Sequence, residues 1–209
     1  MRKEILIMTK SAKINGFCIA GIDISNGRWI RLVSNDENGE GSVSIVDLTF
    51  QNGTQAEIFD LVAVECMPAP TEAQTENYLY DNRYCWEKIR TMSPEEAFAE
   101  CKLSNSQFLF ENNERSLDDN EITGESLVLA EIDHIVINVV NEYDKKKWKV
   151  NFDYNSFKYS NISIGDISIR NKYYNYGTYK ILGKHMAVFS LTGKYNKTGK
   201  YYKMLAQLF

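Results

Sequence analysis

The chain has 209 residues, of which 44% are hydrophobic and 25% are charged, and its net charge at pH 7 is −4. This length and balance fit one or two globular domains with a sizeable core, which excludes a disordered or fibrous protein. Residues 1–140 carry 11 Lys and Arg against 24 Asp and Glu, whereas residues 141–209 carry 13 against 4 and ten of the 13 tyrosines. A basic, tyrosine-rich end is typical of chains with an anionic partner, commonly nucleic acid.

Residues 1–70 are predicted to form a first β unit. Its end is marked by Pro68 and Pro70, because proline cannot donate a hydrogen bond to a strand ladder. Four apolar runs and one ambiguous segment give five elements. They are Glu4–Thr9, Phe17–Ile24, Arg28–Ser34, the ambiguous Val43–Phe50, and Ile58–Met67.

A hairpin is predicted inside this unit, at Asn26–Gly27. Asn-Gly between two β-rich runs favours a two-residue type I′ turn, since both central positions need a positive φ. That turn would pair Ile24 with Trp29 and Ile22 with Arg31, and all four would share one face.

Residues 71–126 are predicted to be a helical spacer followed by an acidic loop. The sequence Ser93-Pro94-Glu95-Glu96 has the signature of a helix start, with Ser as N-cap, Pro at the first position and Glu closing a capping box. Residues 111–126 are polar and acidic with few apolar anchors, which predicts a mobile loop there.

Residues 127–209 return to β patterning and are predicted to form a second five-stranded unit. A basic stretch, residues 165–184, is expected to be irregular. The five strands are Leu127–Val140, Trp148–Tyr154, Phe157–Ile164, Met186–Thr192 and Tyr201–Leu208. The fold class is therefore mainly β, with two tandem OB-like five-stranded barrels and a short helical spacer. Strand counting alone leaves SH3-like barrels equally open.

Five stretches together resemble a bacterial family, the dual OB-containing domain, in the right order over nearly the whole chain. They are EILIMTKS at the start, FCIAGIDISNGRWIRLVS, a Pro-x-Pro followed by ENYLYD (Glu76–Asp81), SLVLAEI (Ser126–Ile132), and the ending SLTGKYNKTGKYYKMLAQLF. The resemblance implies two OB-folds in tandem and a role in recognising nucleic acid, in a defence or mobile-element setting. It supplies no catalytic motif.

The main candidate binding segment is residues 170–180, where four tyrosines and three cations occur without apolar periodicity. Single-stranded nucleic acid is bound by base stacking on aromatic rings, with cations along the phosphates. The alternative is a loop whose tyrosines merely cover one end of the barrel. The candidates here are Arg170, Lys172, Tyr173, Tyr174, Tyr176 and Lys180.

Strand alternation supplies a second set of candidates. In residues 147–154 it sends Trp148 and its alternate neighbours to one face and the lysines to the other, and in the last strand it predicts that Tyr201 and Lys203 point outward. The expected cationic face comprises Lys147, Lys149, Lys158, Tyr201 and Lys203. Solvated lysines on an exposed face are the equal alternative.

In the first unit, Trp29 and Arg31 stand two apart on one strand and so share a face. On an open face they offer a stacking platform and a phosphate contact. On a core face Trp29 packs with Ile22 and Ile24, and Arg31 needs a partner.

Enzyme signatures are absent: the chain has no GxGxxG, GxxxxGK[ST], HExxH or GxSxG. His134 alternates with Ile132 and Val136 and is expected in the core, while His185 lies beside Lys184 in a basic turn. The four cysteines form no CxxC pair and are expected to be reduced, without zinc. Asp153 and Asp166 lack a third ligand for a metal-dependent nuclease. No metal, cofactor or catalytic residue is predicted.

These features predict a non-enzymatic module that binds nucleic acid, single-stranded DNA or RNA being favoured. The alternative is a protein-interaction or adaptor domain that docks a partner chain through the aromatic loop, and an enzyme with a hidden metal site ranks well behind. The apolar run at the N-terminus, Ile5–Met8, is too short for a signal or a membrane span, so a cytoplasmic location is expected.

Overall fold

The structure is a computed structural model, and it describes residues 1–35, 40–122 and 124–209. The chain divides into two compact units, Met1–Lys102 and Leu103–Phe209. Each is built mainly from β-strands, as the sequence predicts. Within the described residues, no helix is both long enough and apolar enough to span a membrane.

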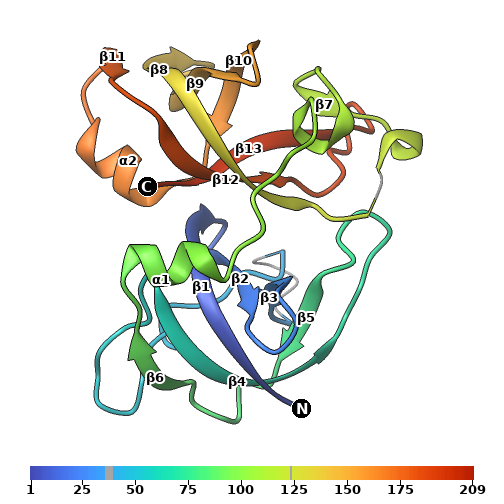
Figure 1. Ribbon diagram of the computed structural model, residues 1–209, viewed down its shortest axis with the longest axis vertical. Coiled ribbons are helices and arrows are strands. Elements are labelled where there is room, and N and C mark those ends of the chain that lie inside the picture. Colours follow the sequence, from blue (N-terminus) through green and yellow to red (C-terminus); the bar gives the residue numbers. More distant parts are fainter. Residues whose placement is uncertain (36–39, 123) are drawn as a thin grey trace. The chain divides into compact units, whose positions relative to one another are not determined.

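The first unit is a closed five-stranded barrel (Figure 1). Its ring runs β1–β2–β3–β5–β4 and closes where β4 pairs with β1, with β3 and β5 parallel. A sixth strand pairs with β4 outside the ring, and a short helix follows it. The elements are β1 (Arg2–Lys13), β2 (Gly16–Asp23), β3 (Arg28–Val33), β4 (Asp60–Pro68), β5 (Asn77–Tyr80), β6 (Glu87–Thr91) and α1 (Pro94–Ala99).

The interior of this barrel is filled by branched aliphatic residues from alternate strand positions. Ile5 and Ile7 of β1, Ile19 of β2, and Ile30 and Leu32 of β3 all belong to one buried cluster. Each such side chain contributes about 1.5–3 kcal/mol when fully buried. The ambiguous segment 43–50 forms turns rather than a full strand, although its apolar residues join the same cluster.

The β2–β3 hairpin forms where Asn-Gly predicted it, but with a longer turn. Ile22 pairs with Trp29, so the predicted register is wrong by two residues. The side chain of Asp23 explains the longer turn, because its carboxylate accepts hydrogen bonds from Ser25 N at 3.0 Å and from Asn26 Nδ2 at 3.1 Å. Asx turns of this kind compete with the tight two-residue turn.

The predicted helical spacer, residues 71–126, is wrong in two ways. Its first part contributes β5 and β6 to the first barrel, so this unit extends to Lys102 instead of ending at residue 70. Its second part belongs to the second unit. The predicted helix start is confirmed: Ser93 Oγ accepts from Glu96 N, and the Glu96 carboxylate accepts from Ser93 N at 2.8 Å.

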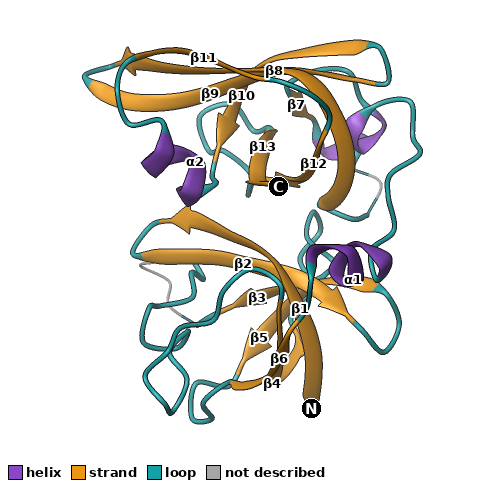
Figure 2. Cartoon of the chain, turned by 60° about the vertical axis from the view of Figure 1, so that its left-hand side comes forward, coloured by secondary structure: helices purple, strands orange, loops and turns teal. Residues whose placement is uncertain are grey.

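The second unit repeats the topology of the first. Its ring runs β8–β9–β10–β13–β12 and closes on β8, with β10 and β13 parallel. The stretch 165–184, expected to be irregular, forms α2 and β11, and β11 lies beside β8 (Figure 2). The elements are η1 (Leu109–Glu111), β7 (Ser116–Leu117), η2 (Asp119–Glu121), β8 (Leu127–Glu142), β9 (Lys145–Tyr154), β10 (Phe157–Ile164), α2 (Ile167–Lys172), β11 (Gly177–Ile181), β12 (His185–Leu191) and β13 (Tyr201–Leu208).

The acidic segment 111–126, expected to be a mobile loop, is anchored to this barrel. Its strand β7 pairs with β13, and the preceding residues Leu109 and Phe110 are buried. The hydroxyl of Tyr159, inside the barrel, accepts from Leu109 N and donates to Asn112 O, both at 3.0 Å. The segment therefore closes one end of the barrel.

Candidate nucleic-acid interface

The outer face of β9 presents a row of lysines, as the alternation predicted. Val150 and Phe152 are buried in the barrel, and the intervening positions turn outward. Lys147 is exposed, whereas the side chain of Lys149 is only 14% exposed, with Nζ 3.2 Å from Ser163 Oγ on β10 and 3.7 Å from a Glu142 carboxylate oxygen. The result is a polar sheet face with cations along its second strand.

Strand β11 extends this face on the far side of β8. Thr178 pairs with Asn138 and donates to its side-chain oxygen at 2.9 Å, and Asn138 in turn pairs with Lys149. Lys180 is exposed and pairs with Val136 in the same alternation, so it joins the outer face. Lys158 is exposed on β10, opposite Asp153.

The predicted tyrosine segment lies on the opposite face of β9 and surrounds a lysine. Nζ of Lys146 is 3.5 Å from the ring centroid of Tyr174, 4.9 Å from that of Tyr176 and 5.9 Å from that of Trp148. It also donates to Tyr174 O at 2.9 Å, and Trp148 Nε1 donates to Tyr173 O at 2.8 Å. The tyrosine rings thus already bind a cation of their own chain, apart from the Lys147–Lys149 face.

Two further residues of this segment have local structural contacts. The guanidinium of Arg170 is partly buried and donates twice to Ile164 O, at 2.9 Å from Nε and 2.5 Å from Nη2. Lys172 is exposed in the last turn of α2, with Nζ 5.4 Å from the Tyr173 ring centroid. Arg170 therefore fastens α2 to the end of β10, whereas Lys172 stays open to solvent.

The prediction that Tyr201 and Lys203 face outward is wrong. Lys203 is only 1% exposed, and Tyr201 is also buried. Nζ of Lys203 donates to Asn112 O and lies 4.9 Å from the Tyr159 ring centroid. Tyr201, Lys203 and Leu205 are the buried alternate positions of β13, so the alternation has the opposite phase to the predicted one. Burial lowers the pKa of Lys203 to about 7.

The first barrel offers no open cationic face at the predicted place. Arg31 is 3% exposed and pairs with Glu76 at 3.3 Å, and Trp29 is buried. The core alternative is therefore the correct one for Trp29, and Arg31 has the partner that its position demanded. Their neighbours on this face, Ala20 and Ile22, are also buried, so these side chains do not reach a nucleic acid from the surface.

Two exposed tyrosines were not among the candidates predicted from the sequence. Tyr143, in the two-residue turn between β8 and β9, is 96% exposed. Tyr195, in the loop between β12 and β13, is exposed beside Lys194 and Lys197. The positions of both tyrosines in the predicted OB-fold could have indicated them. OB-folds bind oligonucleotides with the face of strands 2 and 3 and with the loops between strands 1 and 2 and strands 4 and 5.

Two lysines of the β12–β13 loop are paired with acids of η2. Lys194 pairs with Asp119, and Lys200 pairs with Asp118 at 3.1 Å. The Asp118–Asp119 pair thus neutralises part of the loop that would meet an anionic ligand.

His134 is not in the core as predicted; its side chain is 76% exposed. A register shift between Asp133 and Val136 marks a β-bulge, and His134 has a φ of 49° there. Asp166 is fully buried as the N-cap of α2, so it does not join Asp153 in a surface site. His185 Nδ1 lies 2.8 Å from Phe209 O.

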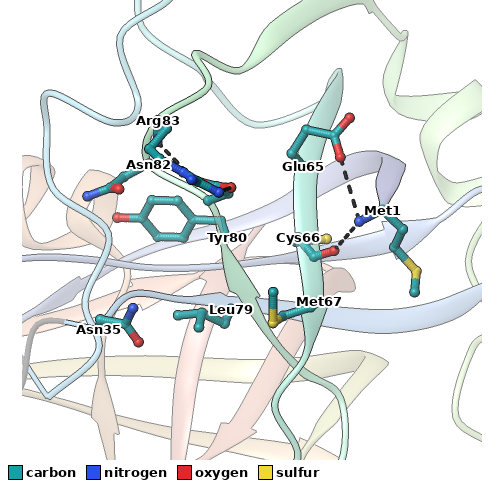
Figure 3. Close-up of a pocket in the computed structure, with 10 residues that line it drawn as sticks. Met1, Asn35, Glu65, Cys66, Met67, Leu79, Tyr80, Asn82 and Arg83 are labelled. Atoms are coloured by element: carbon teal, nitrogen blue, oxygen red, sulfur yellow. Dashed lines mark hydrogen bonds and ion pairs between the residues drawn. The ribbon is translucent and has the colours of Figure 1, made fainter.

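A cavity of about 320 Å³ lies beside the start of β1 (Figure 3). The amino group of Met1 donates to Cys66 O at 2.9 Å, and Arg83 pairs with Asp81 at 2.7 Å. Burial raises the pKa of the Cys66 thiol to about 11, so the thiol stays protonated and unreactive. All four cysteines are free, as expected.

Comparison with known proteins shows to which family the chain belongs. No curated protein and no solved structure matches the chain. The model of the dual OB-containing domain matches residues 3–208, which is nearly the whole chain. This match agrees with the two barrels of identical topology, each with a 1-2-3-5-4-1 strand order. The chain belongs to the dual OB-containing domain family.

Proposed function

We propose that the chain binds single-stranded nucleic acid on the outer face of its second barrel. The observation that carries the proposal is the lysine row of β9, where Lys145, Lys147 and Lys149 alternate onto one face. Strand β9 is the second strand of the ring, and OB-folds bind oligonucleotides on strands 2 and 3. Lysines at this place can follow a phosphate backbone.

Exposed aromatic residues lie in the two loops that OB-folds use for binding, those between strands 1 and 2 and strands 4 and 5. Tyr143 lies in the turn that leads into β9, and Tyr195 lies in the loop that leads into β13. A base stacked on either ring gains about 1–3 kcal/mol, whatever its identity. The proposed surface therefore combines cations for phosphates with platforms for bases, and it favours single strands, whose bases are free to stack.

The charge balance sets an upper limit on the affinity. The second unit carries 14 Lys and Arg against 12 Asp and Glu, whereas the first carries 10 against 16. A near-neutral domain lacks the broad basic footprint of tight non-specific binders. We therefore expect modest affinity with a strong dependence on salt, confined to the second barrel.

Fluorescence anisotropy with labelled single-stranded DNA and RNA tests the proposal. Replacing Lys147 and Lys149 with Gln should weaken binding and flatten the log–log salt slope by about 0.7 for each phosphate that the protein no longer neutralises. The matched control replaces Lys102, an exposed lysine of the first unit, with Gln, and it should change neither the affinity nor the salt slope. Replacing Tyr143 with Ala should weaken binding while leaving the salt slope intact.

Absence of binding near 50 mM salt, or equal effects of the β9 and Lys102 variants, would contradict the proposal. The aromatic loop would then be the first surface to probe for a protein partner, because Tyr174, Tyr176 and Leu182 are exposed there. The proposal includes no catalytic step. Its extension to a defence or mobile-element setting rests on the family resemblance alone.

A further inference from the structure

We propose that Asp133, His134 and Asp153 form a binding site for a divalent first-row transition metal such as Mn²⁺ or Zn²⁺. The three side chains come from β8 and β9 of the second barrel, and their ligand atoms all lie within 4.8 Å of one another. The site is independent of the nucleic-acid proposal and uses none of its lysines.

The distances between these atoms fit a common metal ion. His134 Nδ1 is 3.2 Å from Asp133 Oδ1 and 3.2 Å from Asp153 Oδ2. Ligand atoms bound at about 2.1 Å to one tetrahedral or octahedral ion lie roughly 3.0–3.4 Å apart when they are adjacent. The imidazole nitrogen therefore already stands at coordination spacing from both carboxylates.

The β-bulge brings the three residues together. In a regular strand, neighbours such as Asp133 and His134 point to opposite faces. The register shift between Asp133 and Val136 leaves one extra residue on β8, and both side chains lie on the side of Asp153. Bulges re-aim side chains in this way next to functional sites.

Electrostatics favours a cation at this point. Asp133 and Asp153 are direct partners in the β8–β9 register, and like charges opposite each other destabilise a sheet. Among the residues that the structure describes, His134 provides the ion-pair contact to both carboxylates. Lys184, the nearby cation of the β11–β12 connection, pairs instead with Glu131 at 2.7 Å. A divalent ion would neutralise both carboxylates at once.

The donor set selects the class of metal. Two carboxylate oxygens suit Mg²⁺, Ca²⁺ or Mn²⁺, whereas an imidazole nitrogen shifts the preference toward first-row transition metals. The side chain of His134 is 76% exposed, so the remaining coordination positions face solvent and accept water or an anionic oxygen. An open site of three ligands binds more weakly than a closed structural zinc site.

The test is a titration of the full chain with MnCl₂, followed by NMR of the histidine imidazoles. The chain has two histidines, and His185 serves as the more distant reporter, because its ring nitrogens contact Phe209 O at 2.8 Å and Leu182 O at 3.1 Å and not the three proposed ligands. Paramagnetic Mn²⁺ should broaden the His134 signals at lower concentration than those of His185, which lies one strand away, opposite Ile132.

Matched variants separate a site from diffuse binding to acids. Asp153→Asn should require at least about tenfold more Mn²⁺ for the same broadening. Asp144→Asn removes an exposed carboxylate of the β8–β9 turn and should behave like the wild type. In His134→Ala, the broadening of backbone amides at Asp133 and Asp153 should likewise need at least about tenfold more Mn²⁺. Parallel broadening of both histidines, or equal behaviour of the Asp153 and Asp144 variants, would overturn the proposal.

Discussion

Replacing Lys203 with Met is expected to stabilise the second barrel near neutral pH and to remove part of its pH dependence. Lys203 is buried, and burial lowers the pKa of its ammonium group from 10.5 to about 7. Glu114 and Glu121 act in the opposite direction but do not compensate. Met has a similar length and no charge to desolvate, and Asn112 O keeps the hydrogen bond from the Tyr159 hydroxyl.

The size of the effect follows from the two pKa values. Between about pH 7 and 10.5 the unfolded chain keeps a proton on Lys203 that the folded chain has released. Unfolding therefore takes up a proton, and the free energy of unfolding rises with pH by at most about 1.4 kcal/mol per unit. From pH 7.5 to 9.5 the Lys203 contribution is roughly 2–3 kcal/mol, and the Met variant should lack it.

Urea unfolding at pH 7.5 and 9.5 measures this difference. Trp148 is the single tryptophan of the second unit, so its indole ring signals in NMR spectra report on that barrel separately from Trp29 and Trp86 of the first unit. Lys158→Met, at an exposed position on β10, is the control and should keep the pH dependence of the wild type. Parallel pH profiles for the wild type and the Lys203 variant, or a Met variant that is markedly less stable at pH 7.5, would refute the reasoning.

Three further predictions follow from local contacts. Ser93→Ala removes the hydrogen bond to Glu96 N and should lower the free energy of unfolding of the first unit by about 1 kcal/mol in a urea titration, whereas an unchanged midpoint would argue against the cap. The double variant Asp118→Asn, Asp119→Asn removes the ion-pair partners of Lys194 and Lys200. It should bind single-stranded oligonucleotides more tightly and steepen the salt slope by about 0.7 for each of these lysines that contacts a phosphate. An equal or weaker affinity, measured by fluorescence anisotropy, would contradict this. Exposed Cys85 should react with a thiol reagent before Cys66 and Cys101 under native conditions, because desolvation raises the pKa of Cys66 to about 11 and that of Cys101 to about 12. Early labelling of Cys66 or Cys101, detected by mass spectrometry, would contradict this.

The sequence predicted the elements that depend on local chemistry. The capping box at Ser93 and the hairpin position at Asn26–Gly27 follow from side chains a few residues apart. The register of that hairpin did not follow, because Asp23 offers its carboxylate to the turn and lengthens it. Strands β5 and β6 were missed because β6 is short and exposed, with no alternation to mark it.

The candidate site was predictable only in part, since its geometry depends on long-range contacts. The alternation of β9 gave Lys147 and Lys149 their correct face. For Lys203 the same reasoning failed, because a polar side chain can be buried when a distant segment supplies a carbonyl such as Asn112 O. His134 was misplaced because a bulge shifts the alternation by one residue without a mark in the sequence.

The strand β11 has a consequence for any truncation of the second unit. Strand β8 pairs with β12 up to Ile132 and with β11 from Ile135, so one edge of this long strand changes partner at the bulge. Without residues 173–182, the outer half of that edge would present unpaired backbone amides and carbonyls to other molecules. Such open edges recruit foreign strands and lead to aggregation. A shortened version should therefore be judged first by its solubility, before any weakening of binding is ascribed to missing tyrosines.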